Sequence, residues 1–461
     1  MLAQMRPVVR DSMLVAPSYV VPGVVSLLLV GLLFATLGAA QYGVWALMFA
    51  LASGVPLLTT SAVESLVLRY GHRGAGAINP LAAPLALVAT AGVTAVAGVL
   101  LLPDPDASQI AATSLLAVTI GAYFIRVAQL RAELRFGTAS ILASMRSIVG
   151  GGLALFAAAV AGPTGAAAGM ALGFVLSIGL TARRSNDPPT EMVEAGTRTD
   201  QRAYGLASMV IAVALFLLAA GDRFILSVFR PLEDVGLYAA VYTIVDLVVR
   251  LAPSVVTVAI RTPVFRAWDR AGSRVLTAWV GSLFTVVLWG SSIVSLLLDV
   301  TSRWWLPNPV SQALVAPIAF GLTAGAVATG IGSLYAASEM QPRLALLIGV
   351  SAALNIGLNV LWVPTAGPQG SAVATLVSFS VLLVLSLLGL GRPVIQTRPD
   401  VAVWSLCVAA AAFTLAANGV ALWLAAACLV AGLVPLRVVA WRVLRPPPEL
   451  VERSVRRASA P

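Results

Sequence analysis

Five charged residues lie inside long apolar stretches of this sequence: Arg146, Asp222, Arg223, Asp246 and Arg250. A charged side chain at the centre of a bilayer costs about 3 kcal/mol on insertion scales, so such residues are first candidates for function. Arginine binds phosphate through paired hydrogen bonds and stays charged when it leaves water. The chemistry that these residues suggest is the binding of an anionic, phosphate-bearing group within a membrane.

The elements that must position these charges are membrane-spanning helices. The chain has 461 residues, of which 59% are hydrophobic and 10% are charged, whereas a soluble protein carries about 25% charged residues. At about 20 residues per span, we expect an all-α polytopic membrane protein with roughly 12 to 14 transmembrane helices. The expected spans are 12–37, 43–68, 79–102, 108–130, 138–161, 165–182, 204–229, 235–260, 275–299, 310–338, 343–362, 369–390, 400–416 and 419–440.

The arginines indicate the orientation of these spans. They fall in every second loop, and only Arg230 and Arg303 lie in the alternate loops. Positive charge concentrates in cytoplasmic loops, so we expect both termini on the cytoplasmic side of the membrane. We expect this membrane to be the plasma membrane, which is the bacterial inner membrane. The first basic residues lead directly into a full-length apolar stretch, which favours an uncleaved first helix.

Other classes of protein are disfavoured by the same composition. All basic residues are arginine, which excludes a P-loop with its lysine. The net charge of +10 is spread over many loops, so no nucleic-acid partner is expected. The single His72 and two cysteines provide no metal framework. No cofactor and no catalytic site are therefore expected, and the outer loops are too short for the acceptor domain of a glycosyl polymerase.

The chain divides into two similar halves. The tetrapeptide GVWA at 43–46 matches GLYA at 236–239, and AGPTGAA at 161–167 matches AGPQGSA at 366–372. Six spans per repeat give both units the same orientation, with the substrate path of a transporter between them. We expect a six-helix lobe at 1–182, a cytoplasmic linker at 183–203 and a second six-helix lobe at 204–391. An accessory helix pair at 392–445 and a basic cytoplasmic tail at 446–461 would follow.

Three groups of residues resemble known motifs at matching positions. They are LGAAQYGVWA at 37–46; DRFIL and VGLYAA at 222–226 and 235–240; and NIGLN, VP and GPQGSAVAT at 355–359, 363–364 and 367–375. In order and spacing they resemble the polysaccharide flippases, of O-antigen and capsule type, in the MOP exporter superfamily. That superfamily also contains the MATE drug exporters and the lipid II flippases. The extra helix pair resembles the members with fourteen helices.

The resemblance implies a flippase that moves a polyprenyl-diphosphate-linked oligosaccharide from the inner to the outer leaflet by alternating access. A cationic cavity lined mainly by spans 1, 2, 7 and 8 would receive the diphosphate, for synthesis of a cell-surface polysaccharide. The partners would be this lipid-linked glycan, the bilayer, and possible polysaccharide polymerases and glycosyltransferases. The alternatives are a MATE-like ion-coupled drug exporter, a membrane glycosyl polymerase and a scaffold for envelope synthesis.

Three arginines are the candidate substrate-binding residues. Arg250 lies near the middle of its span, and the alternative to a headgroup contact is an ion pair with Asp246 one turn before it. Arg146 lies about 12 Å from the cytoplasmic end of its span, where it binds substrate or extends to the inner surface. Arg223 and Asp222 contact substrate, extend to the outer surface, or take part in a salt bridge that closes the lobes.

The carboxylates Asp246, Asp222 and Glu64 are candidates for ion coupling or for salt bridges. Glu64 lies close to the inner end of its span, which favours a solvated position. Asn355 and Asn359 share a helical face, and we expect them to form interhelical hydrogen bonds.

Overall fold

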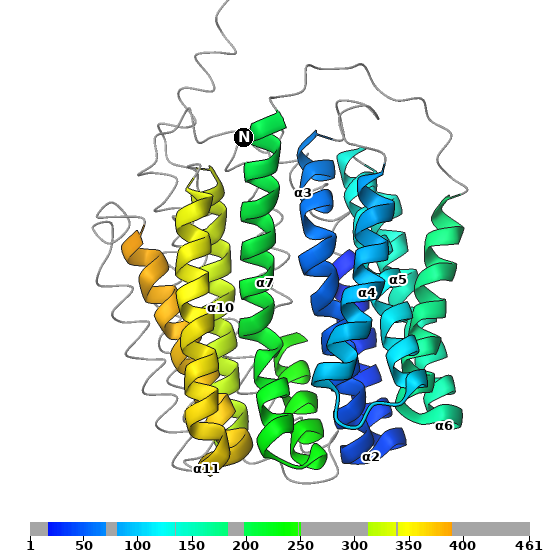
Figure 1. Cartoon of the computed structure of the whole chain (residues 1–461), viewed down its shortest axis with the longest axis vertical. Helices are drawn as coiled ribbons and strands as arrows, with labels where there is room; N and C mark the ends of the chain where they lie inside the picture. Colours follow the sequence, from blue (N-terminus) through cyan, green and yellow to red (C-terminus); the bar gives the residue numbers. More distant parts are fainter. Residues whose placement is uncertain are drawn as a thin grey trace, which may run out of the picture. The chain divides into compact units, whose positions relative to one another are not determined.

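The described part of the chain is helical throughout and consists mainly of long apolar helices (Figure 1). The computed structural model describes residues 17–70, 81–133, 135–182, 198–247, Val249, 312–337 and 340–389. Within these ranges seven helices are long and apolar enough to cross a membrane. The prediction of an all-α multi-pass membrane protein is thereby confirmed, whereas the expected spans 275–299, 400–416 and 419–440 lie outside the described residues.

Three of the long helices turn at a glycine and contain two of the expected spans each. They are α2 (Pro17–Thr59), α6 (Phe136–Ala182) and α11 (Gln341–Gly389), with turns at Gly38, Gly162 and Gly367. All three glycines have positive φ, which a residue without Cβ adopts readily. Gly162 (φ 58°, ψ −144°) and Gly367 (φ 57°, ψ −137°) have nearly the same conformation, as expected from the second repeat match.

The two arms of α6 run antiparallel. A Cβ atom added to Gly169 would collide with the carbonyl oxygen of Leu153, and one added to Gly173 would collide with the Cα atom of Gly150. As the residue number rises on the second arm, the number of its contact on the first arm falls, as in a helical hairpin. The Gly162 turn therefore joins the expected spans 138–161 and 165–182, and glycines allow the arms to approach closely.

In α11, buried polar side chains join the two arms. Asn359 donates to the carbonyl oxygen of Asn355 at 2.8 Å, and Ser371, beyond the Gly367 turn, donates to the side-chain oxygen of Asn359. All three polar residues are fully buried. The prediction of an interhelical hydrogen bond is confirmed for Asn359, whose partner Ser371 the sequence had not indicated, whereas Asn355 bonds to Asn359 within its own arm.

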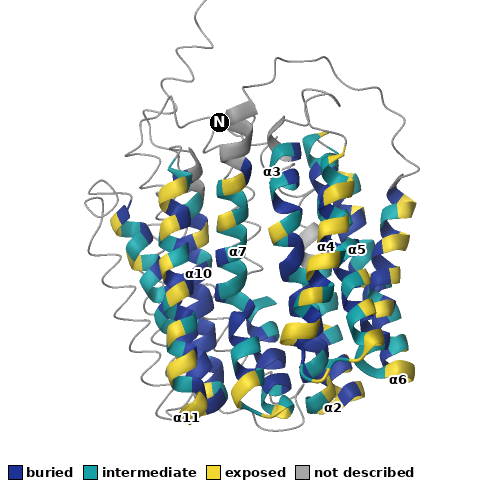
Figure 2. Cartoon of the chain, in the orientation of Figure 1, coloured by how far each residue is buried: buried dark blue, intermediate teal, exposed yellow. Residues whose placement is uncertain are grey.

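The face that α4 (Ala82–Leu101) presents to its surroundings is apolar. Its buried residues, Ala86, Thr90, Thr94 and Gly98, recur every four positions and form one stripe. The remaining faces expose large apolar side chains, including Val88 (71%) (Figure 2). An apolar surface of this kind matches the hydrocarbon of a bilayer, where side chains need no water.

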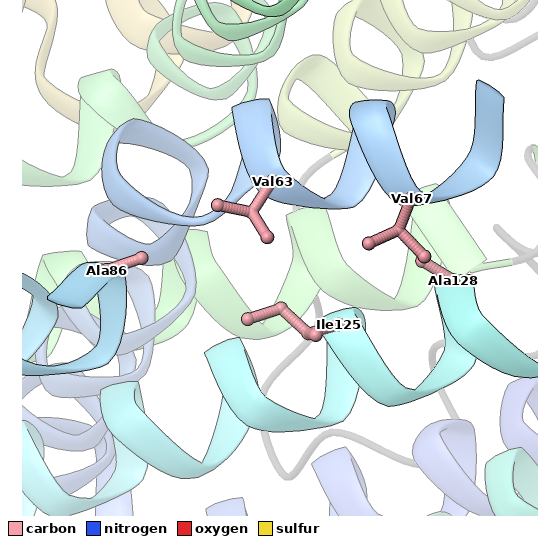
Figure 3. Close-up of a cluster of buried hydrophobic side chains, with 5 residues drawn as sticks. All are labelled: Val63, Val67, Ala86, Ile125 and Ala128. Atoms are coloured by element: carbon pink, nitrogen blue, oxygen red, sulfur yellow. The ribbon is translucent and has the colours of Figure 1, made fainter. Parts of the chain in front are cut away.

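At one end of these helices, α3 (Ser61–Tyr70) packs onto α4 and α5 (Ala107–Ala132) through an apolar cluster. Figure 3 shows this cluster, in which Val63 and Val67 of α3 contact Ala86, Ile125 and Ala128. The expected span 43–68 thus comprises the end of α2 and most of α3, with helical hydrogen bonds continuing through Thr60 between them.

Helix α7 (Arg198–Phe229) packs against α2 and α3, and the helix at 232–247 packs against α2. Ala62 lies beside Gly205, and Phe216 packs into the space left by Gly54. Further along, a Cβ atom on either Gly43 or Gly236 would collide with the backbone of the opposite helix. The two glycines of the first repeat match are thus in contact.

Helix α7 begins earlier than the expected start at residue 204, so the end of the predicted linker 183–203 is helical.

A second compact unit contains α10 (Gln312–Ala337) and the part of α11 after residue 374. A Cβ atom on Gly321 would lie 2.9 Å from the Cα atom of Leu376, and Gly325 lies against Phe379. Tyr335 donates to the carbonyl oxygen of Ser386 at 2.8 Å. The contacts advance together along both helices, which therefore run parallel, as expected for two even-numbered spans.

Candidate functional site

Arg146 lies within the membrane-spanning part of α6 and faces the interior of the helical bundle. It is ten residues from the start of α6, which places it about 15 Å along the helix, half the thickness of a bilayer core. The residues one turn away on the same face, Leu142 and Gly150, are buried, whereas Ile141 and Ile148 on another face are exposed. The side chain of Arg146 is therefore directed toward protein, away from the apolar surface.

Two aromatic rings hold the guanidinium of Arg146. Its Cζ atom lies over the ring of Tyr123 at 5.1 Å and over the ring of Phe174 at 5.3 Å from the centroids. The two rings meet edge to face, with centroids 5.3 Å apart. Tyr123 and Phe174 lie nine and eight residues from the ends of α5 and α6, at about the depth of Arg146. The guanidinium of Arg146 is therefore held between these rings at this depth, and its contact with substrate stays a prediction.

Close packing of the two arms of α6 creates this arrangement. Gly150 lies one turn after Arg146, and Gly173 directly precedes Phe174. Because Gly150 and Gly173 are in backbone contact, Phe174 is brought beside Arg146. The run of three glycines at 150–152 thus has one member at the helix crossing, whereas Gly152 faces open space.

The described residues around Arg146 include no carboxylate within 4 Å of its guanidinium. Its Nη2 donates to the hydroxyl of Ser147 at 3.1 Å, and its buried Nε has no hydrogen-bond acceptor among the described residues. The ion pair within 4 Å in the described part of the chain is that of Arg135 with Glu133, just before α6. A partly buried cation without a carboxylate can bind an anion, which would satisfy the donor and offset the cost of burial.

A second arginine with similar properties lies three residues after Tyr123. Arg126 lies in the last two turns of α5, which ends at Ala132, and within the expected span 108–130. Its Nη1 donates to Gln129 at 3.3 Å, while its buried Nε and Nη2 have no acceptor in the described structure.

Asp222 and Arg223 lie in the last two turns of α7, which ends at Phe229, and are both buried. Asp222 is fully buried, and its carboxylate accepts hydrogen bonds from the hydroxyl of Tyr238 and from the backbone N–H of Arg223. Arg223 is 8% exposed; its Cζ lies 5.3 Å from the ring centroid of Tyr242, and its Nη2 is 3.4 Å from the hydroxyl of Thr243. The interpretation as outer-surface side chains is therefore wrong, because packing against helix 232–247 buries both.

Asp222 and Arg223 form no salt bridge with each other at 4 Å or less, and the lobe-closing salt bridge stays a prediction. Successive residues of a helix point in different directions. Arg223 is instead an electrostatic neighbour of Tyr42 on α2, so the cluster joins residues of spans 1 or 2, 7 and 8.

The other predicted residues are placed individually. Glu64 lies partly buried in the first turn of α3, where the helix dipole favours negative charge, and Arg131 of α5 is its charged neighbour. Asp246 is partly buried near the end of the described helix 232–247. Arg250 lies outside the described residues, so its pairing with Asp246 stays a prediction.

The aromatic partners Tyr123, Phe174 and Tyr242 were missed by sequence reasoning. Hydropathy gives the depth of a residue but does not give the rotation of each helix about its axis, so partners on other helices stay hidden. Tyr238 carried some indication, because it belongs to the repeated tetrapeptide.

Comparison with known proteins identifies the fold. The structure of the lipid II flippase MurJ in an inward closed conformation is similar, with a TM-score of 0.67 and 14% identity over 95% of this chain and 99% of that chain. A structure of the Vibrio cholerae MATE transporter VcmN is similar, with a TM-score of 0.58 and 14% identity over 86% and 98% of the chains. No family model and no curated protein matches the sequence. The chain therefore has the fold of the MOP superfamily transporters and flippases, and the predicted MATE/MOP-like fold is confirmed.

Proposed function

We propose that this protein is a flippase that moves a polyprenyl-diphosphate-linked oligosaccharide from the cytoplasmic to the outer leaflet, for synthesis of a cell-surface polysaccharide. The observation that carries the proposal is the placement of Arg146 at mid-depth of a helical bundle without a carboxylate within 4 Å in the described structure. A diphosphate needs such cations along its path, whereas a cationic drug would be repelled by them.

The pathway that we propose follows the repeat. Alternating access would part α2 from helix 232–247 at the contact between Gly43 and Gly236, on the predicted outer side. Arg146 and Arg223 are the proposed substrate-binding residues in the described structure, and Arg250 is the third by sequence. Polysaccharide polymerases and glycosyltransferases are the partners that such a pathway would require, in a plasma membrane with both protein termini in the cytoplasm.

Ion coupling is proposed for Asp222 among the predicted carboxylates. It is fully buried, and its carboxylate accepts hydrogen bonds from the hydroxyl of Tyr238 and from the backbone N–H of Arg223. Binding of a proton or another cation there would alter the packing of α7 against helix 232–247, which is the movement that coupling requires. Asp246 and Glu64 are only partly buried, and salt bridges are the roles proposed for them.

A MATE-like exporter of cationic drugs is the second candidate, favoured by the same buried carboxylate at Asp222 and by the similarity to VcmN. A single experiment separates the two functions. Cells depleted of the protein are analysed for lipid-linked glycans by mass spectrometry and for survival in cationic drugs. We expect one complete polyprenyl-diphosphate oligosaccharide to accumulate while its surface polymer is lost. An unchanged glycan profile with new drug sensitivity would reject the flippase and favour the exporter.

A further inference from the structure

The aromatic rings around Arg146 leave its hydrogen-bond donors available. A ring attracts a cation through its π face and accepts no hydrogen from the guanidinium in the way that a carboxylate does. Tyr123 and Phe174 therefore stabilise the charge of Arg146 without occupying its N–H groups. Of these groups, the structure gives one contact, from Nη2 to Ser147, and Nε has no acceptor.

The rings are also well fixed. Tyr123 is 7% exposed and Phe174 is 2% exposed, and they contact each other edge to face. The crossing of Gly150 and Gly173 determines the distance between Phe174 and Arg146. An arginine has many rotamers, and their loss on binding weakens affinity unless the side chain is already held in place.

We propose that Tyr123 and Phe174 are positioning residues that hold Arg146 ready to bind one phosphate group of the substrate. The inference rests on the proposed function and deepens it by assigning the anion contact and its supports to α5 and α6. A carboxylate in place of the rings would compete with the phosphate for the same donors. The rings offset part of the burial cost of the cation and still allow the phosphate to arrive and leave.

The test measures binding of farnesyl diphosphate, a short polyprenyl diphosphate, to the purified full chain by calorimetry, with melting temperature as a check on folding. Phe174→Leu and, independently, Tyr123→Leu are expected to weaken binding about fivefold to tenfold. The ring-preserving variants Phe174→Tyr and Tyr123→Phe are expected to weaken it less than the leucine variants. Arg146→Met is expected to weaken binding by about a hundredfold, because it removes a charge-assisted contact.

A double-mutant cycle distinguishes positioning from a general structural role. If the rings act through Arg146, then Phe174→Leu and Tyr123→Leu have no further effect in the Arg146→Met background. An equal loss of affinity in both backgrounds would overturn the inference, as would unchanged affinity in Arg146→Met, and either result would leave the proposed flippase in place. Failure of the wild-type protein to bind farnesyl diphosphate would overturn the inference and the proposed function together.

Discussion

Arg146 and Arg223 both lie beside aromatic rings within apolar helices, but their charges are balanced differently. Arg223 is 8% exposed and directly follows the fully buried Asp222, whose opposite charge lies in the same helix turn. Arg146 is partly exposed, and in the described structure its surroundings offer rings and one hydroxyl. Arg223 thus belongs to a buried cluster that contains an opposite charge, whereas Arg146 has no neighbouring carboxylate among the described residues.

The largest difference is expected when each arginine is replaced by methionine in turn. Arg146→Met should abolish transport, with the melting temperature close to that of the wild type, because its charge has no protein counter-charge to lose. Arg223→Met should lower the melting temperature, because the buried carboxylate of Asp222 then loses the positive charge nearest to it. Complementation of a depleted strain and thermal melting of the purified proteins measure the two effects. Equal loss of stability in both variants would remove the distinction.

The helix crossing beneath Arg146 is expected to tolerate no side chain. Gly173→Leu places atoms against the backbone of Gly150, and overpacking of this kind costs about 1 to 3 kcal/mol. It should also separate Phe174 from Arg146 and reduce transport. Gly152→Ala is the matched control, because Gly152 faces open space and alanine favours a helix by about 1 kcal/mol. Melting temperatures below the wild type for both variants would contradict this account of the crossing.

The sequence predicted the long elements well where single spans were involved. The expected spans 108–130 and 310–338 correspond to α5 and α10 within about two residues, because charged or polar residues bound both apolar stretches. The glycine turns at Gly162 and Gly367 lie within the repeat match, but the match gave no sign of the positive φ at these glycines or of the close packing of the arms that they join. For the site, the sequence predicted that Arg146 lies inside the membrane but did not predict which residues contact it. Those contacts depend on the rotation of each helix about its axis and on how the helices pack.

A third arginine, Arg230, is a control for this comparison because the protein itself accepts its hydrogen bonds. Arg230 donates from Nε to the carbonyl oxygen of Val363 at 3.2 Å and from Nη2 to that of Pro364 at 3.1 Å, beside the Gly367 turn. Its donors are used by protein, so Arg230→Ala should cost about 1 kcal/mol of stability. The affinity of the Arg230→Ala variant for farnesyl diphosphate should equal that of the wild type. Calorimetry that gave a weaker affinity would place Arg230 among the anion contacts.

The smallest effect is expected at Asp106, a carboxylate that contrasts with the buried Asp222. Asp106 caps α5 by accepting from the hydroxyl of Ser108 at 2.6 Å and from the backbone N–H of Gln109 at 2.7 Å. These hydrogen bonds lower the pKa of the Asp106 carboxyl. The stabilisation is therefore present above the pKa of an unfolded aspartate and is lost as pH falls through the lower folded value. Asp106→Ala should slightly lower the melting temperature at pH 7 and leave it unchanged at pH 2.

The most direct test of the central claim is transbilayer movement of a fluorescent polyprenyl-diphosphate disaccharide in liposomes that contain the purified full chain. Under an imposed ion gradient, the wild type should transfer the lipid between leaflets. Arg146→Met, reconstituted to the same density, should transfer it no faster than protein-free liposomes. Transfer by Arg146→Met at the wild-type rate would contradict the assignment of Arg146 to the substrate path.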